Sequence, residues 1–480
     1  MRTARATAVV FGTSAAVLVL EIIAGRLMAP YVGVSLQTFT GIIGTVLAGI
    51  AAGAAVGGIV ADRRDPRTMI GPALVIGGAL TWLSVPIVTG LGPKMDSEPV
   101  AIVLLTAAAF FLPVAVLSAV SPMVAKLRLA DLDETGTVVG GLSAAGTFGA
   151  LAGTFLTGFV LVAALPSKTI VVVIGAVLVA AGIVASWRLR GRPPALPGIG
   201  LALLVLWSGL NVATVRSTCE HETAYSCVRV EAVPGHPSAR NLYLDRLRHA
   251  YVDPKHPTEL DVRYVRLFAD VVRAMPGGPL DALHIGGGGF SFPEYLDAVR
   301  TGSHNRVLEI DADLVKIAKR ELGLVESKHL VVDVGDARLA LAHLRPDSYD
   351  LVVGDAFSGE SVPWHLTTAE VMQEIDRGLR PGGVLVMNVI DGGRNRFARA
   401  EVATLSSQFR HVAVIVPAGG VPASEPANQV LVASRAPIPS FAVAPADGEV
   451  LRGAAVTRYV DGARRLTDDY APVDQLVMPF

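Results

Sequence analysis

Leu283-His-Ile-Gly286-Gly287-Gly288-Gly289 is the stretch of this sequence that decides the fold of its second half. A short apolar run leads directly into glycines, which is typical of a buried strand followed by a tight turn. Glu309 follows 21 residues after Gly288, at the end of a second apolar run. In a doubly wound sheet, such glycines let the backbone approach a nucleoside, and such an acid accepts hydrogen bonds from its ribose. The spacing therefore predicts a nucleoside site.

Alternating strand and helix patterns continue through this half. We expect strands at 281–285, 306–310, 329–334, 350–353 and 384–389, preceded by a β-hairpin region over 225–252 and a helix over 257–272 that Thr258 caps. Strands separated by helices predict a parallel sheet, whose ligands bind where the strands end. Gly335-Asp336 and Asp355 both follow such strands. We therefore expect them beside the glycine turn, with the Gly335-Asp336 pair placed to meet an adenine amino group and Ala337 also binding the cofactor.

The residues after the turn favour one class of nucleoside. Gly288 is followed by Gly289-Phe-Ser-Phe-Pro and not by the second half of a dinucleotide fingerprint. An S-adenosyl-type ligand is therefore favoured over NAD. His284 lies inside the buried strand, where a core histidine is the simpler interpretation.

The first half of the chain has the composition of a membrane domain. Charged residues make up 17% of the whole chain, and all 10 histidines lie beyond residue 215. We count seven apolar stretches, most of them near the ~20 residues that cross a bilayer, at 7–27, 38–60, 69–90, 99–124, 137–163, 168–187 and 197–214. We expect a membrane domain of about seven transmembrane helices over 1–215, a hairpin and linking helix over 216–275, and an α/β domain over 276–480. The seventh stretch is the shortest.

Small and ionisable residues mark several of these spans. Gly49, Gly53 and Gly57 recur at four-residue spacing, as do Gly149 and Gly153, which favours close helix packing. Glu21 and Arg26 lie in the first span, where an ionisable group needs a partner or a cavity. A structural role is favoured for both over a part in transport.

Basic residues predict the orientation of the spans. If all seven stretches cross, ten basic residues fall on the side of the amino terminus and four on the other, Arg26, Lys94, Lys168 and Arg216. This places the amino terminus in the cytoplasm of a multi-pass cell-membrane protein, and the second half outside. If the seventh stretch does not span, the second half returns to the cytoplasm.

The two cysteines, Cys219 and Cys227, follow the last span. In an oxidising compartment they would form a disulfide that closes a small loop. Two free thiols, or metal binding together with His221, are the alternatives. We expect the disulfide and no metal.

From about residue 225 to 389 the sequence resembles the spermidine synthase (polyamine aminopropyltransferase) family, and especially its membrane-fused members. The resemblance rests on Leu242-Tyr-Leu-Asp245, Ile285-Gly-Gly-Gly288, Glu309-Ile-Asp311, Gly335-Asp336 and Tyr349-Asp350 leading to Asp355. It implies a class I S-adenosylmethionine-dependent transferase (Rossmann-like) fold. It also implies a cofactor site of Gly286, Gly287, Gly288, Glu309, Asp336 and Ala337.

The departures from the family lie at the expected reaction centre. Gly289 stands where the family has an aspartate after the glycines, and Ser358 stands where it has its usual catalytic base. Aminopropyl transfer needs carboxylates that attract an amine and take its proton. Asp355 is retained and is the predicted catalytic residue. Tyr264, which matches a family tyrosine, and Glu360 are the predicted substrate-binding residues.

The resemblance predicts aminopropyl transfer from decarboxylated S-adenosylmethionine to a small amine such as putrescine. A methyltransferase that uses S-adenosylmethionine itself is one alternative. A transporter or sensor that binds a nucleoside or polyamine without turnover is another. The expected partners are the lipid bilayer and the amine, with a homodimer left open. The net charge of −1 gives no indication of nucleic acid.

Overall fold

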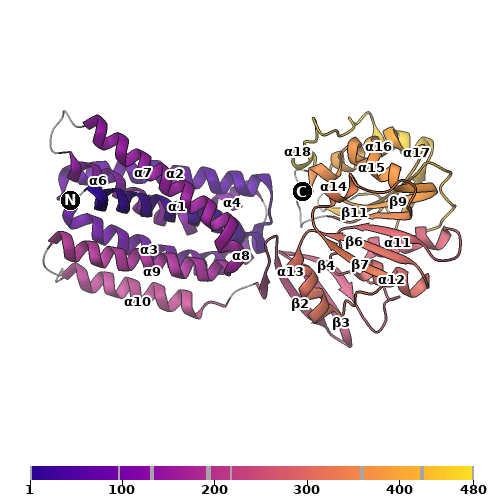
Figure 1. Cartoon of the computed structure of the whole chain (residues 1–480), viewed down its shortest axis with the longest axis horizontal. Helices are drawn as coiled ribbons and strands as arrows, with labels where there is room; N and C mark the ends of the chain where they lie inside the picture. The colour runs from indigo at the N-terminus through magenta and orange to yellow at the C-terminus, as the bar shows by residue number, and fades with distance from the viewer. Residues whose placement is uncertain are drawn as a thin grey trace. The chain divides into compact units, whose positions relative to one another are not determined.

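The computed structural model describes residues 3–95, 98–129, 135–190, 196–216, 219–356, 362–421 and 426–477. The chain divides into two compact units, Met1–Cys227 and Val228–Phe480. We call them the helical unit and the α/β unit, and Figure 1 labels their elements. The division falls beyond the change in composition near Arg216, because residues 219–227 are bound to the helices that precede them.

The helical unit consists of long apolar helices. Six stretches are long and apolar enough to cross a membrane, by length and composition: Thr3–Val32, Leu36–Arg63, Pro66–Lys94, Pro99–Arg128, Thr135–Ala164 and Ser167–Leu189. The seventh predicted stretch forms helix α10 (Leu196–Thr214). The apolar part of α10 that can be assessed, Gly200–Thr214, is shorter than a membrane span. Within the described residues the number of candidate spans is therefore six. The orientation inferred from seven spans stays a prediction.

The other helices of this unit follow the predicted apolar stretches. They are α1 (Thr3–Val32), α2 (Leu36–Arg63), α3 (Pro66–Leu91), α4 (Pro99–Thr106), α5 (Leu112–Ser118), α6 (Val120–Arg128), α7 (Thr135–Leu156), α8 (Val162–Ala164) and α9 (Ser167–Arg190). Two π-helical turns, Ala107–Phe111 and Thr157–Leu161, connect α4 to α5 and α7 to α8. Each of these two pairs of helices therefore forms one continuous apolar helix with a π-helical turn inside it.

Glycines set the spacing of the helices. A methyl group on Gly57 of α2 would lie 2.6 Å from the Ala119 backbone, and one on Gly53 would overlap the backbone of Ala115. On α7, Gly149 and Gly153 pack in the same way against the backbone of α1. In a bilayer, which offers helices no hydrophobic drive to associate, such close contact stabilises a bundle. The predicted packing role of the glycine repeats is confirmed.

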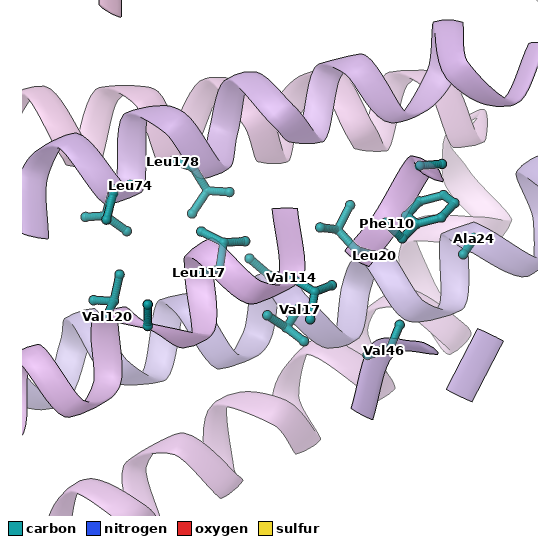
Figure 2. Packing of buried hydrophobic residues seen from close by; sticks show 14 of the residues in the cluster. Val17, Leu20, Ala24, Val46, Leu74, Phe110, Val114, Leu117, Val120 and Leu178 are labelled. Atoms are coloured by element: carbon teal, nitrogen blue, oxygen red, sulfur yellow. The ribbon is translucent and has the colours of Figure 1, made fainter. Parts of the chain in front are cut away.

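A buried apolar cluster fills the space between these helices. Figure 2 shows Val17 and Leu20 of α1 directed toward Phe110, Val114 and the neighbouring helices. Phe110, Val114 and Leu20 are each no more than 1% exposed.

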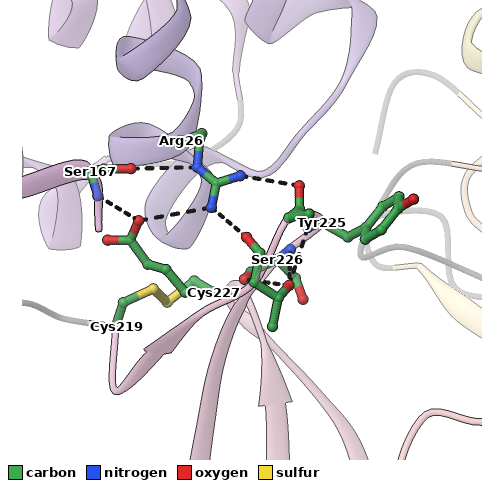
Figure 3. Close-up of polar contacts among 9 residues, drawn as sticks. Arg26, Ser167, Cys219, Tyr225, Ser226 and Cys227 are labelled. Carbon is green, nitrogen blue, oxygen red and sulfur yellow. Dashed lines mark hydrogen bonds and ion pairs between the residues drawn. A yellow bond between two sulfur atoms is a disulfide. The ribbon is translucent and has the colours of Figure 1, made fainter. Parts of the chain in front are cut away.

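Arg26, on α1, is bound by the segment between the two cysteines. Its guanidinium donates hydrogen bonds to the Ala224 carbonyl at 3.1 Å and to the Thr223 carbonyl. Its Nε donates to Ser167 Oγ at 3.4 Å, and Nη2 lies 3.8 Å from Glu222 Oε2. Figure 3 shows these contacts converging on the one guanidinium. The contacts satisfy the charge of Arg26 and support its structural role.

Residues 219–227 form a closed loop at this point of the helical unit. The sulfurs of Cys219 and Cys227 are joined in a disulfide. Glu222, inside the loop, also accepts a hydrogen bond from the backbone N–H of Ser167 at 2.8 Å. The loop is therefore attached both to α1 and to the start of α9.

The α/β unit begins with the predicted hairpin region. Strands β2 (Cys227–Val233), β3 (His236–Leu244) and β4 (Leu247–Val252) pair as antiparallel neighbours. The linking helix, expected over 257–272, instead begins at Arg263 as α11 (Arg263–Ala274), so the predicted cap at Thr258 is wrong. Backbone hydrogen bonds from His256 to Asp253 and from Glu259 to His256 form turns there, where two prolines oppose a helix.

The main sheet has eight strands in the order β12-β10-β11-β9-β8-β5-β6-β7. The strands are β5 (Asp281–Ile285), β6 (His304–Glu309), β7 (Leu330–Val334), β8 (Tyr349–Gly354), β9 (Leu379–Asp391), β10 (His411–Val416), β11 (Ala427–Ser434) and β12 (Glu449–Arg452). β9, β8, β5, β6 and β7 are parallel, as predicted. The pairs of β9 with β11, β11 with β10 and β10 with β12 are antiparallel, which the helix–strand alternation did not predict.

Helices cover both faces of this sheet (Figure 1). Because side chains alternate along a strand, Val352 of β8 packs with the face that carries α15 (Ala369–Gly378) and α16 (Arg396–Gln408), while Leu351 and Val353 pack on the face of α11 and α12 (Ser291–Val299). The remaining helices are α13 (Ala312–Ile317), α14 (Ala337–Leu341), α17 (Ala454–Val460) and α18 (Val473–Val477). The predicted fold class, a helical bundle followed by a doubly wound α/β domain, is confirmed.

Candidate functional site

The predicted site residues follow the ends of four neighbouring parallel strands. β5 leads into Gly286, β6 ends at Glu309, β7 leads into Gly335 and Asp336, and β8 leads into Asp355. Backbone hydrogen bonds connect these ends: Gly286 N–H donates to the Leu308 carbonyl, and Gly335 N–H donates to the Glu309 carbonyl, both at 2.9 Å. The structure therefore brings these residues to one edge of the sheet, where ligands of such sheets bind.

Glycine is required at the first position of the turn for two reasons. Gly286 has a φ of +92°, a conformation that residues with a side chain rarely adopt. A methyl group there would also overlap the carbonyl of Asp355. The backbone N–H of Asp355 donates to the Ile285 carbonyl at 2.9 Å. The glycine turn and the Asp355 backbone are consequently in direct contact.

Glu309 holds the glycine turn through backbone hydrogen bonds. Its Oε2 accepts hydrogen bonds from the backbone N–H of Gly287 at 2.8 Å and of Gly288 at 3.3 Å, and its Oε1 accepts from Asp311 N–H at 2.9 Å. Burial raises the pKa of this carboxyl, and the backbone hydrogen bonds oppose that rise. A carboxylate offers about four lone-pair sites, so three donors leave acceptor capacity for a ribose hydroxyl.

Asp336 and Ala337 occupy the start of α14. Asp336 caps this helix, and its Oδ1 accepts from Arg338 N–H at 2.8 Å. His365 Nε2 lies 3.9 Å from the same oxygen, and the neighbouring Trp364 side chain is 47% exposed. An imidazole side chain, distant in sequence, therefore lies close in space to the predicted adenine-facing residue Asp336.

Asp355 is held by two neutral donors. The Tyr264 hydroxyl donates to Oδ2 at 2.8 Å, and Asn388 Nδ2 donates to Oδ1 at 3.0 Å. Burial raises the pKa of Asp355 to about 6, although both hydrogen bonds favour the charged form. Burial also raises the pKa of Tyr264 well above its ordinary value, so this phenol keeps its proton and remains a donor. A carboxylate with a pKa close to neutrality is suited to general base chemistry.

Two asparagines extend this arrangement and were missed from the sequence. Asn428 Nδ2 donates to Asn388 Oδ1 at 2.9 Å, which leaves the Asn388 amide oriented with its donor toward Asp355. Asn388 lies on β9 and Asn428 on β11, an antiparallel pair. The signal available in the sequence was Asn388 inside the apolar run of β9 and the amide pair Asn428-Gln429 at the start of β11.

The presence of Gly289, where the family that the sequence resembles has an aspartate, has a steric explanation. A methyl group on Gly289 would lie 2.5 Å from Ala250 Cβ and 2.9 Å from a methyl of Val252. β4 therefore occupies the space that an aspartate side chain would need. The other departure, Ser358, and the predicted substrate residue Glu360 lie outside the described residues.

These residues define a doubly wound α/β unit with a nucleoside-type site at the ends of its strands. No protein-family model matches the chain. The chain is 37% identical over 133 residues to a polyamine aminopropyltransferase of Vibrio vulnificus, covering 27% of this chain and 44% of that protein. It is 34% identical over 77 residues to a probable polyamine aminopropyl transferase of Bifidobacterium longum, covering 16% of this chain and 17% of that protein. The chain thus spans less than half the length of these curated relatives.

Part of the chain is also similar to two solved structures of different names. A probable spermidine synthase from Corynebacterium glutamicum has 25% identity and a TM-score of 0.49, covering 52% of this chain and 95% of that one. Human methyltransferase-like protein 13, in complex with SAH, has 20% identity and a TM-score of 0.33, covering 45% of this chain and 100% of that one. The predicted resemblance to the spermidine synthase family is confirmed by the curated relatives.

Proposed function

We propose that this chain is a membrane-bound enzyme that transfers an aminopropyl group from decarboxylated S-adenosylmethionine to a small amine such as putrescine. The curated relatives, both named for aminopropyl transfer, favour this reaction over methyl transfer. The six apolar helices support the membrane location. The observation that carries the proposal is the buried Asp355 carboxyl, bound to Tyr264 and in backbone contact with the glycine turn.

The nucleoside would lie along the strand ends. The glycine turn, with its backbone open to a ligand, would meet the substituents of the sulfonium, and Glu309 would accept from the ribose. Asp336 and Ala337 would face the adenine. This order follows the order of the strands β5, β6 and β7 across the sheet.

Asp355 would prepare the nucleophile. The ammonium group of the acceptor gives a proton to the Asp355 carboxylate, and the freed nitrogen lone pair attacks the aminopropyl carbon bound to sulfur. The new C–N bond forms as the C–S bond breaks, and the electron pair of that bond returns to sulfur. The cationic sulfonium leaves as the neutral thioether 5′-methylthioadenosine. Tyr264 keeps the carboxylate oriented, and Glu360 would attract the second cationic end of a diamine.

The full-length protein in detergent micelles tests this proposal. Incubated with decarboxylated S-adenosylmethionine and putrescine, it should release 5′-methylthioadenosine and spermidine in equal amounts. Asp355→Asn should lower the rate by on the order of 10² or more, since general base catalysis contributes 10²–10⁴. Glu309→Ala should weaken methylthioadenosine binding, and Glu326→Ala, which alters a solvent-exposed carboxylate paired with Lys319, should change neither.

Two results would contradict the proposal. If methylthioadenosine binds but no amine is aminopropylated, the α/β unit is a binding module, as the loss of an acid at Gly289 would allow. If methylthioadenosine does not bind, and Glu309→Ala behaves as the wild type, the nucleoside site itself is wrong.

A further inference from the structure

A basic pocket lies at the opposite edge of the sheet from the nucleoside-type site. It has a volume of about 460 Å³ and is lined by Ser406, Arg410, His411, Arg452 and Thr457 together with apolar side chains. β10 runs parallel to β9, because each pairs antiparallel with β11. His411 opens β10, and Arg452, paired with Ala413, closes β12. The pocket therefore lies where the parallel strands begin, away from Asp355 and Glu309.

The charge of the basic pocket is uncompensated. Its lining contains two arginines and a histidine but no carboxylate. Within the described ranges, none of these three side chains has a hydrogen bond or ion pair, and neither do the hydroxyls of Ser406 and Thr457. By contrast, Arg266 and Arg380 of the same unit each bind carboxylates at 2.6 Å. The basic pocket thus collects donors that no described residue of the chain uses.

One of the arginines is held in place without using its donors. The Arg452 guanidinium stacks on the Phe441 ring, with 4.4 Å between its carbon and the ring centroid. Phe441 is buried, at 8% exposed. Partial burial lowers the pKa of Arg452, although the residue as a whole is exposed. A guanidinium fixed by stacking keeps its N–H fork free for an anion.

We propose that the basic pocket binds a phosphate monoester. Two guanidinium groups match the charge of about −1.5 to −2 that a phosphate monoester carries near pH 7, whereas a carboxylate would leave one of them unmatched. Arginine forks bind phosphate oxygens in bidentate fashion. A volume of about 460 Å³ exceeds the need of inorganic phosphate and falls within the range for small organic ligands. Val412, Ile438 and Val456 supply an apolar wall for the organic part.

The phosphate ester could be a soluble metabolite or the head group of an anionic lipid. Both present the same chemistry to Arg410, His411 and Arg452. The experiment therefore compares phenyl phosphate, inorganic phosphate and short-chain phosphatidic acid as probes. Binding of phenyl phosphate assigns the site to soluble esters, and binding of phosphatidic acid alone assigns it to a lipid head group.

Isothermal titration calorimetry on the full chain in a neutral detergent measures the binding, at about 0.15 M salt to screen weak surface contacts. Phenyl phosphate or phosphatidic acid should bind with a stoichiometry of one, and inorganic phosphate more weakly. Arg410→Gln combined with Arg452→Gln should weaken binding roughly 10- to 100-fold, as expected for lost charge-assisted hydrogen bonds. Arg345→Gln, an exposed arginine outside the pocket, is the matched control and should bind like the wild type.

The proposal is overturned if no probe binds saturably, or if the double variant and the Arg345→Gln control bind alike. Near-UV circular dichroism establishes that the double variant remains folded. If it does not, Thr457→Val, which removes one hydroxyl and no charge, replaces it and should weaken binding by a smaller factor. Methylthioadenosine binding is measured in parallel, so failure at the strand ends and failure at the basic pocket are separate results.

Discussion

Asp355 is a carboxyl group whose two oxygens each accept one hydrogen bond from a neutral donor. Burial raises its pKa to about 6, and the bond from Tyr264 lowers it. As the base, Asp355 must be ionised, so kcat/KM for the proposed transfer should rise with pH through about 6 and then level. Tyr264→Phe removes a donor to the ionised form, so the pKa of Asp355 and this acidic limb should move to higher pH.

Comparing the pH–rate profiles of the wild type and of Tyr264→Phe measures this shift. Tyr295→Phe is the matched control, because Tyr295 is buried on α12 at 4% exposure and has no bond to Asp355. If the acidic limb of the pH–rate profile moves equally in Tyr264→Phe and Tyr295→Phe, then lost packing, and not the lost hydrogen bond, changes the profile.

At the scale of a single element, α16 carries a buried acid without a partner. Glu401 is 0% exposed, and neither of its carboxyl oxygens has a hydrogen-bond partner among the described residues. Burial raises its pKa well above the ordinary value, so the folded state keeps its proton while the unfolded state ionises. The folded state then binds more protons than the unfolded state, and stability falls as pH rises above about 4.5.

Glu401→Met should therefore stabilise the α/β unit at pH 7, by on the order of 1–3 kcal/mol for a buried polar group that loses its desolvation cost. Glu401→Gln should lose the pH dependence but gain less, because its amide stays unpaired. Differential scanning calorimetry between pH 5 and 8 compares the three proteins. A wild type and Glu401→Gln with parallel pH profiles would mean that Glu401 titrates normally.

At the scale of the whole molecule, the prediction concerns the side of the membrane on which residues 216–480 lie. The basic residues place residues 216–480 outside the cell if seven helices cross, and inside if six do. In intact cells, a membrane-impermeant maleimide should label Cys219 and Cys227 from outside, and only after reduction of their disulfide. Arg64→Cys, in the turn between α2 and α3, is the control and should be labelled only in permeabilised cells.

If Cys219 and Cys227 react only after permeabilisation, as Arg64→Cys does, the α/β unit lies in the cytoplasm and the seventh stretch is not a span. The proposed enzyme would in that case have ready access to cytoplasmic nucleosides.

The edge of the sheet that carries the predicted cofactor residues could be predicted, because it follows from the order of strands along the chain. Strand periodicity located β5 to β8, and parallel strands present their carboxyl ends at one edge, so Gly286, Glu309, Asp336 and Asp355 had to come together. The linking helix was predicted too early, because Pro254 and Pro257 form turns where the apolar spacing suggested a helix. The antiparallel strands β10 to β12 were not predicted, because helix patterns do not alternate with these strands along the sequence.

The sequence by itself determined the two classes of domain, the apolar spans and the glycine turn, because each depends on composition or on spacing along the chain. Only the tertiary structure decided what surrounds the site. The glycine turn meets Asp355 because Gly286 has no side chain, and it carries no acid at Gly289 because Ala250 of β4 fills that space. Asn388, Asn428 and the basic pocket come from strands distant in sequence. Their proximity follows from strand pairing and packing, which residue spacing does not encode.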